Sequence, residues 1–167
     1  MRLQLGIPLF FVCTLLQATV LSRLRVLGGQ PDLIVVLVLA WAILDRDREG
    51  MIWAFVGGLF IDLLSGAPLG ISSLVLVPIT YLVGLTETQV YRTNVLLPLF
   101  LTLSGGLAYH IVYLALLRLL IGQPVAWSTA IWYVTVPSII FDMVLIIPFL
   151  CVLGRWYDGL HPRRVKI

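Results

Sequence analysis

Two long apolar stretches, Val95–Ile121 and Ser128–Leu153, constrain this chain most, because each is long enough to cross a lipid bilayer as a helix. Hydrophobic residues make up 60% of the 167 residues, and charged residues make up only 11%. The mean hydropathy is +1.07. This composition is typical of an integral membrane protein and excludes an ordinary water-soluble domain.

The remainder of the chain contains four shorter apolar segments. At about 20 residues per span, the length allows about six spans joined by short connections, with no extramembrane domain. We therefore predict an all-α integral membrane protein, in which residues 1–167 form a single six-transmembrane-helix bundle. The predicted spans are 5–21, 33–44, 51–65, 71–85, 95–121 and 128–153, followed by a short basic tail at 155–167.

Segments 33–44 and 51–65 are short for a bilayer. Twelve residues form a helix of about 18 Å, whereas the hydrocarbon layer is about 30 Å thick. A re-entrant hairpin is the alternative, but it would place the charged turn Asp45–Glu49 at membrane depth, at a high cost unless the turn lines water. Two short spans, tilted or partly sheltered, are therefore favoured. Asp32 precedes the first of them and is its predicted N-cap.

The distribution of basic residues predicts the orientation. Six spans place both termini on one side, and with that side cytoplasmic, eight of the 11 Lys and Arg residues fall inside, in agreement with the positive-inside rule. The three on the outer side are Arg23, Arg25 and Arg118. Tryptophans are expected at the two interfaces, with Trp41, Trp53 and Trp156 inside and Trp127 and Trp132 outside. The tail is either a contact for anionic lipid or a filament, or a topology signal alone. Its basic residues are Arg155, Arg163, Arg164 and Lys166.

Other function classes find little support in the sequence. The net charge of +3 comes without a basic cluster interleaved with aromatic residues, so we expect no nucleic-acid partner. Cys13 and Cys151 lie in apolar segments, without the spacing of a zinc site. We predict no cofactor, no metal and no enzymatic activity. A serine-protease arrangement of Ser104 with His110 fails, because six residues separate them by about 120° around one helix.

A few polar residues fall within the predicted spans, and helical spacing indicates which way they face. Small residues recur with Asp62 at four-residue steps, and such a stripe faces protein because it lets helices approach closely. That stripe consists of Ala54, Gly58, Asp62 and Gly66. Two further polar seams are expected on the last two spans. They consist of Thr102, Gly106, His110 and Arg118, and of Thr135, Ser138 and Asp142.

Depth in the membrane suggests two pairs among these residues, His110 with Asp142 and Asp62 with Arg118. The seams are either a path for a proton or ligand, since intramembrane ionisable groups are functional candidates, or a set of polar contacts that fixes the register of the helices. The structural interpretation is favoured, because there are only two ionisable residues near the midplane and no repeated relay.

The run Gly57–Gly70 resembles the MreD family of bacterial rod-shape proteins, as does the pattern from Pro31-Asp32-Leu33 through Ala40-Trp41-Ala42 to a charged turn. The resemblance covers essentially the whole chain. Its most specific part is an Asp-x-x-Ser-Gly-x-Pro-Leu-Gly stretch, which is also a helix-stop and reversal signal. This stretch contains the candidate packing or docking residues Asp62, Ser65, Gly66, Pro68, Leu69 and Gly70.

The resemblance implies a non-enzymatic scaffold subunit of the elongasome in the bacterial inner membrane. The implied partners are an MreC-like bitopic protein, through it RodA and its penicillin-binding transpeptidase, and the MreB filament on the cytoplasmic side. The family is similar in fold to the six-helix substrate-binding components of energy-coupling-factor transporters, so a vitamin-type transporter subunit is the alternative function. Those subunits carry an Ala-x-x-x-Ala motif, for which only Thr14 and Ala18 have the spacing here.

Overall fold

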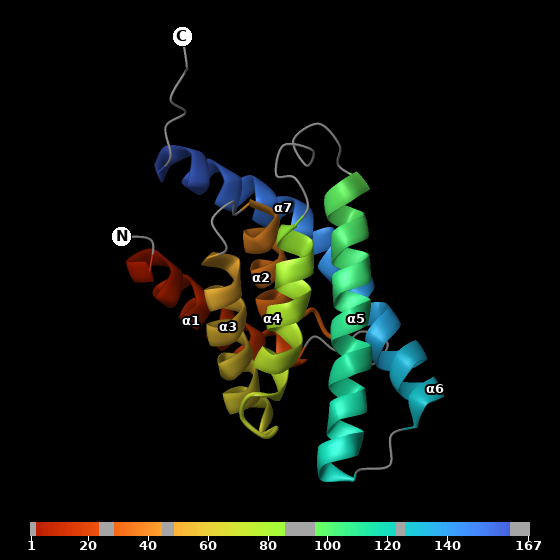
Figure 1. Cartoon of the computed structure of the whole chain (residues 1–167). Helices are drawn as coiled ribbons and strands as arrows, with labels where there is room; N and C mark the ends of the chain where they lie inside the picture. The colour runs from red at the N-terminus through yellow and green to blue at the C-terminus, as the bar shows by residue number, and fades with distance from the viewer. Residues whose placement is uncertain (1–2, 24–28, 45–48, 86–95, 123–125, 161–167) are drawn as a thin grey trace.

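The computed structural model describes residues 3–23, 29–44, 49–85, 96–122 and 126–160, and the regular elements in these ranges are helical (Figure 1). In chain order these are α1 (Leu3–Thr19), η1 (Leu21–Arg23), α2 (Leu33–Leu44), α3 (Glu49–Ser65), α4 (Ile71–Gly84), α5 (Leu96–Ile121), α6 (Trp127–Ala130), η3 (Ile131–Thr135) and α7 (Val136–Leu160).

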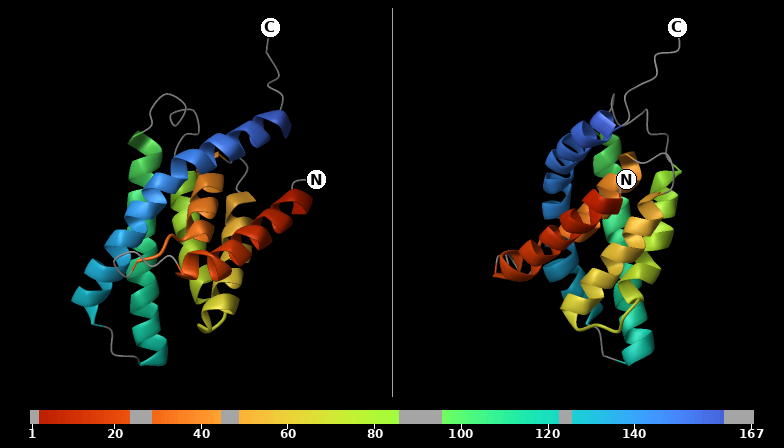
Figure 2. Two further views of the ribbon diagram at one scale, coloured as in Figure 1. Left: turned by 180° about the vertical axis from the view of Figure 1, so that it is seen from behind. Right: turned by 90° about the vertical axis from the view of Figure 1, so that its left-hand side faces the viewer.

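Helix α2 lies at the centre of the bundle, in contact with α1, α3, α4, α5 and α7 (Figures 1 and 2). Its sequence consists of Leu, Ile, Val and Ala except for Trp41, and 11 of its 12 residues are buried. A helix that is apolar on all sides requires such an enclosed position. The short length of α2 is therefore accommodated by protein around it rather than by lipid.

Helices α3 and α4 form an antiparallel pair, joined by a turn with two left-handed glycines, Gly66 at φ 68° and Gly70 at φ 98°. The two helices approach closely at Gly58. A Cβ atom on Gly58 would clash with the backbone of Ser73, so only glycine fits there without moving the helices apart.

Helix α1 packs against α3 through an aromatic stack. The Phe10 and Trp53 rings lie 5.1 Å apart at an angle of 9°. Gly6 leaves room for this arrangement, because a Cβ atom there would fall within the Trp53 ring. Trp53 is 2% exposed, so its ring is enclosed by the bundle and does not lie on the outer surface. Trp132, by contrast, is 69% exposed.

Two described helical stretches, Leu96–Leu120 and Trp127–Arg155, are long and apolar enough to cross a membrane. The outer faces of the bundle are apolar as well, and many large side chains are exposed on them. Examples from α1, α5 and α7 are Phe11, Leu15, Leu103, Leu107, Ile140 and Val144. Exposed apolar surface of this extent is suited to contact with lipid or with other transmembrane helices.

The predicted final span, 128–153, is not one regular helix. A π-helical turn, η3, separates α6 from α7, and α7 continues to Leu160, so the predicted tail is helical over its first residues. Pro137 explains the position of the turn, because it has no N–H to donate to the carbonyl of Tyr133. Arg155 is exposed, whereas Arg163, Arg164 and Lys166 lie outside the described residues.

Candidate functional site

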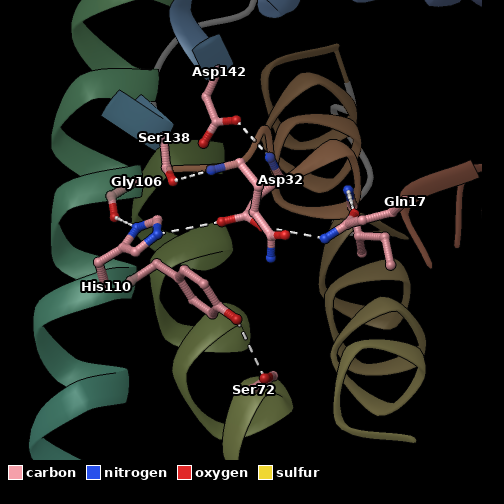
Figure 3. A network of polar contacts seen from close by, with 10 residues as sticks. Gln17, Asp32, Ser72, Gly106, His110, Ser138 and Asp142 are labelled. Atoms are coloured by element: carbon pink, nitrogen blue, oxygen red, sulfur yellow. Dashed lines mark hydrogen bonds and ion pairs between the residues drawn. The ribbon is translucent and has the colours of Figure 1, made fainter. Parts of the chain in front are cut away.

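A network of polar contacts is centred on Asp32, the residue immediately before α2 (Figure 3). The Asp32 carbonyl accepts a bond from the Val36 N–H at 3.0 Å, as expected of an N-cap residue. Its carboxylate, however, turns away from its own helix. Oδ1 accepts a hydrogen bond from Gln17 Nε2 at 3.1 Å, and Oδ2 lies 3.3 Å from His110 Nε2.

The capping oxygen for α2 comes instead from Gln17. Its Oε1 accepts the Ile34 N–H at 3.2 Å. The first N–H groups of a helix have no partner within the helix, and at the enclosed start of α2 they need one from elsewhere in the protein. Gln17 therefore joins α1 to both the side chain and the backbone at the start of α2.

Helix α7 contacts the same segment through two buried side chains. Asp142 Oδ1 accepts the Asp32 N–H at 2.9 Å, and Ser138 Oγ accepts the Gln30 N–H at 3.2 Å. Gly29 lies directly on α7, since a Cβ atom there would be 2.6 Å from Pro137 Cβ. The segment before α2 is thus held against α7 by hydrogen bonds and close packing.

His110 on α5 completes the network. Its Nδ1 lies 2.9 Å from the Gly106 carbonyl oxygen, while Nε2 faces Asp32. The neighbouring Tyr109 ring meets the imidazole edge-on, with centroids 5.4 Å apart, and its hydroxyl lies 3.3 Å from Ser72 Oγ on α4. The polar contacts therefore connect α1, α2, α5 and α7, with α4 at their edge.

His110 and Asp142 do not contact each other directly, so the expected pair between them is wrong. Asp32 lies between them, pairing with His110 through its carboxylate and with Asp142 through its N–H. The similar depth of His110 and Asp142 was the basis for the expected pair, but depth alone does not show whether another segment enters between two helices. Here the chain from Gly29 to Asp32, with Gly29 and Pro31 buried and Gln30 and Asp32 partly buried, occupies that place.

Asp62 forms a second, separate polar cluster at the turn between α3 and α4. It is 1% exposed, and its Oδ2 accepts the Gly70 N–H at 2.7 Å. Both carboxylate oxygens lie 3.2 Å from the Ser72 nitrogen. Gly70 itself supplies no side-chain cap for α4, so Asp62 provides it from the preceding helix. A negative charge at this helix terminus also suits the helix dipole.

The other residues of the specific stretch surround this cap. Ser65 Oγ contacts the Asp62 carbonyl at 3.4 Å and the Ala67 nitrogen at 3.4 Å. Leu69 is 66% exposed, and Pro68 and Gly66 are exposed as well. On the α3 stripe, Ala54, Gly58 and Asp62 are buried. The expected place of Gly66 on this stripe is wrong, because α3 ends at Ser65 and Gly66 is exposed in the turn.

The predicted contact between Asp62 and Arg118 is wrong, because the Asp62 carboxylate is engaged by backbone N–H groups and Arg118 is exposed. Arg118 also does not lie on the face of α5 that carries His110, although the sequence pattern placed it there. It lies eight residues after His110, which turns it by about 80° around the helix axis. The remaining residues of the two seams are buried. They are Thr102, Gly106, His110, Thr135, Ser138 and Asp142.

The Asp32 carboxylate and the His110 ring are mostly shielded from solvent and lie close enough to form an ion pair when His110 is protonated. Within the part of the chain that the structure describes, no group of three or more His, Cys, Asp or Glu residues is placed to hold a metal ion. Ser104 donates to the Phe100 carbonyl at 2.9 Å and is exposed, so it does not join His110.

Sequence reasoning missed Gln17, Gln30 and the role of the Asp32 side chain. Gln17 is an amide in an otherwise apolar helix, and such a residue needs a buried partner or water. That signal could have directed attention to it. Gln30 contributes through its backbone, which carries no such signal.

The family described as rod shape-determining protein MreD matches residues 2–158 of the chain. Searches of curated proteins and of solved structures found no match.

Proposed function

The chain belongs to the MreD family of rod shape-determining membrane proteins, and we propose that it acts as a non-enzymatic scaffold of the elongasome. In this role it binds an MreC-like bitopic protein within the membrane. Through that protein it associates with RodA and its penicillin-binding transpeptidase, and on the cytoplasmic side with the MreB filament. Cell-wall synthesis is thereby linked to the filament that maintains rod shape.

The observation that carries this proposal is the match of almost the entire chain to a shape-determining family, together with the kind of surface that the bundle exposes. The polar side chains gathered around Asp32 and Asp62 are turned inward, while many large apolar side chains are exposed on α1, α5 and α7. Such a body can contact lipid and transmembrane helices, which is what a membrane scaffold requires.

We propose further that the chain crosses the inner membrane six times, with both termini in the cytoplasm. In support, α1, α2, α3, α4, α5 and α7 alternate in direction through the bundle (Figures 1 and 2).

Cysteine labelling tests this orientation. In a background with Cys13 and Cys151 replaced by alanine, Leu69→Cys and Ala126→Cys should react with a membrane-impermeant maleimide from outside the cell. Arg155→Cys should react only after permeabilisation. All three positions are exposed. Equal labelling of all three in intact cells would contradict the orientation.

Co-purification tests the scaffold role. The full chain, extracted in mild detergent, should retain an MreC-like bitopic protein, and its depletion should cause loss of rod shape. Recovery with an ABC-type energising module and a bound vitamin would instead support the transporter alternative.

Paired variants can locate the contact without disturbing the buried network. Phe11→Ala with Leu15→Ala changes the outer face of α1, and Ile140→Ala with Val144→Ala changes that of α7; all four side chains are exposed. If one face binds the partner, only one pair should reduce recovery of the MreC-like protein, and the other serves as its control.

A further inference from the structure

We propose that the network around Asp32 is a proton-binding site, in which the Asp142 carboxyl group holds the proton beside an Asp32–His110 ion pair. The proposal concerns the charge state of the bundle interior and does not depend on which protein the scaffold binds. The ligand is a single proton on one carboxyl oxygen.

The geometry of His110 indicates that its ring is the positive member of the network. Nδ1 lies 2.9 Å from the Gly106 carbonyl oxygen, which can only accept a hydrogen bond. Nε2 lies 3.3 Å from Asp32 Oδ2, a second acceptor when Asp32 is ionised. An imidazole that donates from both nitrogens is the protonated form. Asp32 and His110 therefore form a charge pair.

The Asp32 carboxylate has a hydrogen-bonding neighbour at each oxygen. Its Oδ2 faces His110, and its Oδ1 accepts a hydrogen bond from Gln17 Nε2. Gln17 is oriented as a donor toward Asp32 because its own oxygen accepts the Ile34 N–H. Both carboxylate oxygens of Asp32 thus have a donor.

Asp142 differs from Asp32 and Asp62 in that one of its oxygens is unpartnered. Oδ1 accepts the Asp32 N–H, but Oδ2 has no hydrogen-bond partner among the described residues, although Asp142 is only 1% exposed. Figure 3 shows this second oxygen turned away from the Asp32 backbone. A buried carboxylate with half of its charge unsatisfied is far more costly than a neutral carboxylic acid.

The balance of charge leads to the same assignment. The charged groups that face Asp142 are Asp32, at the start of α2, and His110 on α5. The described residues of η3, from Ile131 to Thr135, contribute no charge. With Asp142 ionised, two carboxylates would share one imidazolium in the bundle interior, leaving an uncompensated negative charge. A proton on Asp142 makes the network neutral.

Infrared spectroscopy of the full chain in lipid nanodiscs tests this assignment. At neutral pH, the exposed carboxyl groups are ionised, so a protonated carboxyl group gives a separate C=O stretching band above the amide I band. We expect such a band, shifted downward in D₂O and absent from Asp142→Asn. Asp62→Asn is the matched control, because Asp62 is equally buried but both of its oxygens have N–H donors, and it should retain the band.

The Asn variant also provides a readout of stability. Asparagine has nearly the shape of a neutral aspartic acid and can accept the Asp32 N–H, so Asp142→Asn should unfold at a temperature close to that of the wild type. Asp142→Glu keeps the acid and should shift the band rather than abolish it. This variant and the wild-type spectrum decide the question even if the Asn variant fails to fold. Absence of the band from the wild type at neutral pH would overturn the proposal, as would a band that persists in Asp142→Asn and disappears in Asp32→Asn.

Discussion

The bundle contains two polar clusters, one around the buried Asp62 and one around the partly buried Asp32, which differ in how far along the chain they reach. Asp62 binds backbone N–H groups eight and ten residues away and closes the turn between adjacent helices. Asp32 is linked to Gln17, 15 residues before it, and to Asp142, 110 residues after it. The first cluster therefore stabilises a local hairpin, whereas the second ties helices from both ends of the chain to the centre of the bundle.

The largest expected effect follows removal of the Asp32 carboxylate. Asp32→Ala leaves the His110 ring buried without its partner and should reduce the free energy of unfolding by about 3–5 kcal/mol. Thermal or denaturant unfolding in detergent, monitored by circular dichroism, measures the change. A loss smaller than that of Asp62→Ala would show that the long-range cluster is not the more important of the two.

Asp62→Ala should reduce the free energy of unfolding less than Asp32→Ala does, and its effect should be confined to the turn between α3 and α4. It leaves the N–H groups of Gly70 and Ser72 without an acceptor, at an expected cost of about 1–3 kcal/mol. Hydrogen exchange should increase at the start of α4 while the amides of α2 remain protected. Asp62→Asn, which keeps one acceptor oxygen, is the control and should be milder. Faster exchange throughout α2 would contradict a local role.

A smaller effect is expected at the edge of the Asp32 cluster. Gln17→Ala removes the bonds to Asp32 Oδ1 and to the Ile34 N–H, each worth about 1 kcal/mol. The stability loss should shrink when Gln17→Ala is introduced into Asp32→Ala, because one of the two bonds is already absent. Fully additive losses would show that the two side chains do not interact.

Arg118→Ala should produce no measurable change in stability, because Arg118 is exposed and the Asp62 carboxylate is bound by the N–H groups of Gly70 and Ser72 instead. The measurement is the unfolding temperature of the variant beside that of Asp62→Ala. A loss similar to that of Asp62→Ala would restore the pair expected from the sequence.

The difference between local contacts and contacts distant in sequence explains which features could be predicted from the sequence. The turn signal of Gly66, Pro68 and Gly70 is local, and the helical reversal occurs there. Four-residue spacing placed Asp62, with Ala54 and Gly58, on one face of α3, and these three residues are buried together. The apolar segment 33–44 corresponds to α2 residue for residue.

Long-range contacts could not be predicted in the same way. Asp32 carries the local signal of an N-cap, and nothing near it indicates that its side chain meets helices distant in sequence. Depth along separate helices suggested partners for His110 and Asp62, but it specifies neither the rotation of each helix nor the segments that pass between them. Residues 29–32 pack against α7 and separate His110 from Asp142, and this packing joins parts of the chain that are more than 100 residues apart.

The central claim is that the segment before α2 lies inside the bundle against α7, and disulfide cross-linking tests it most directly. In a chain with Cys13 and Cys151 replaced by alanine, Gln30→Cys and Ser138→Cys should form a disulfide in high yield in native membranes, since the Gln30 nitrogen lies 3.2 Å from Ser138 Oγ. Gln30→Cys with Ile140→Cys, on the exposed face of α7, should not form one. Equal yields from both pairs, or none from the first, would contradict the account.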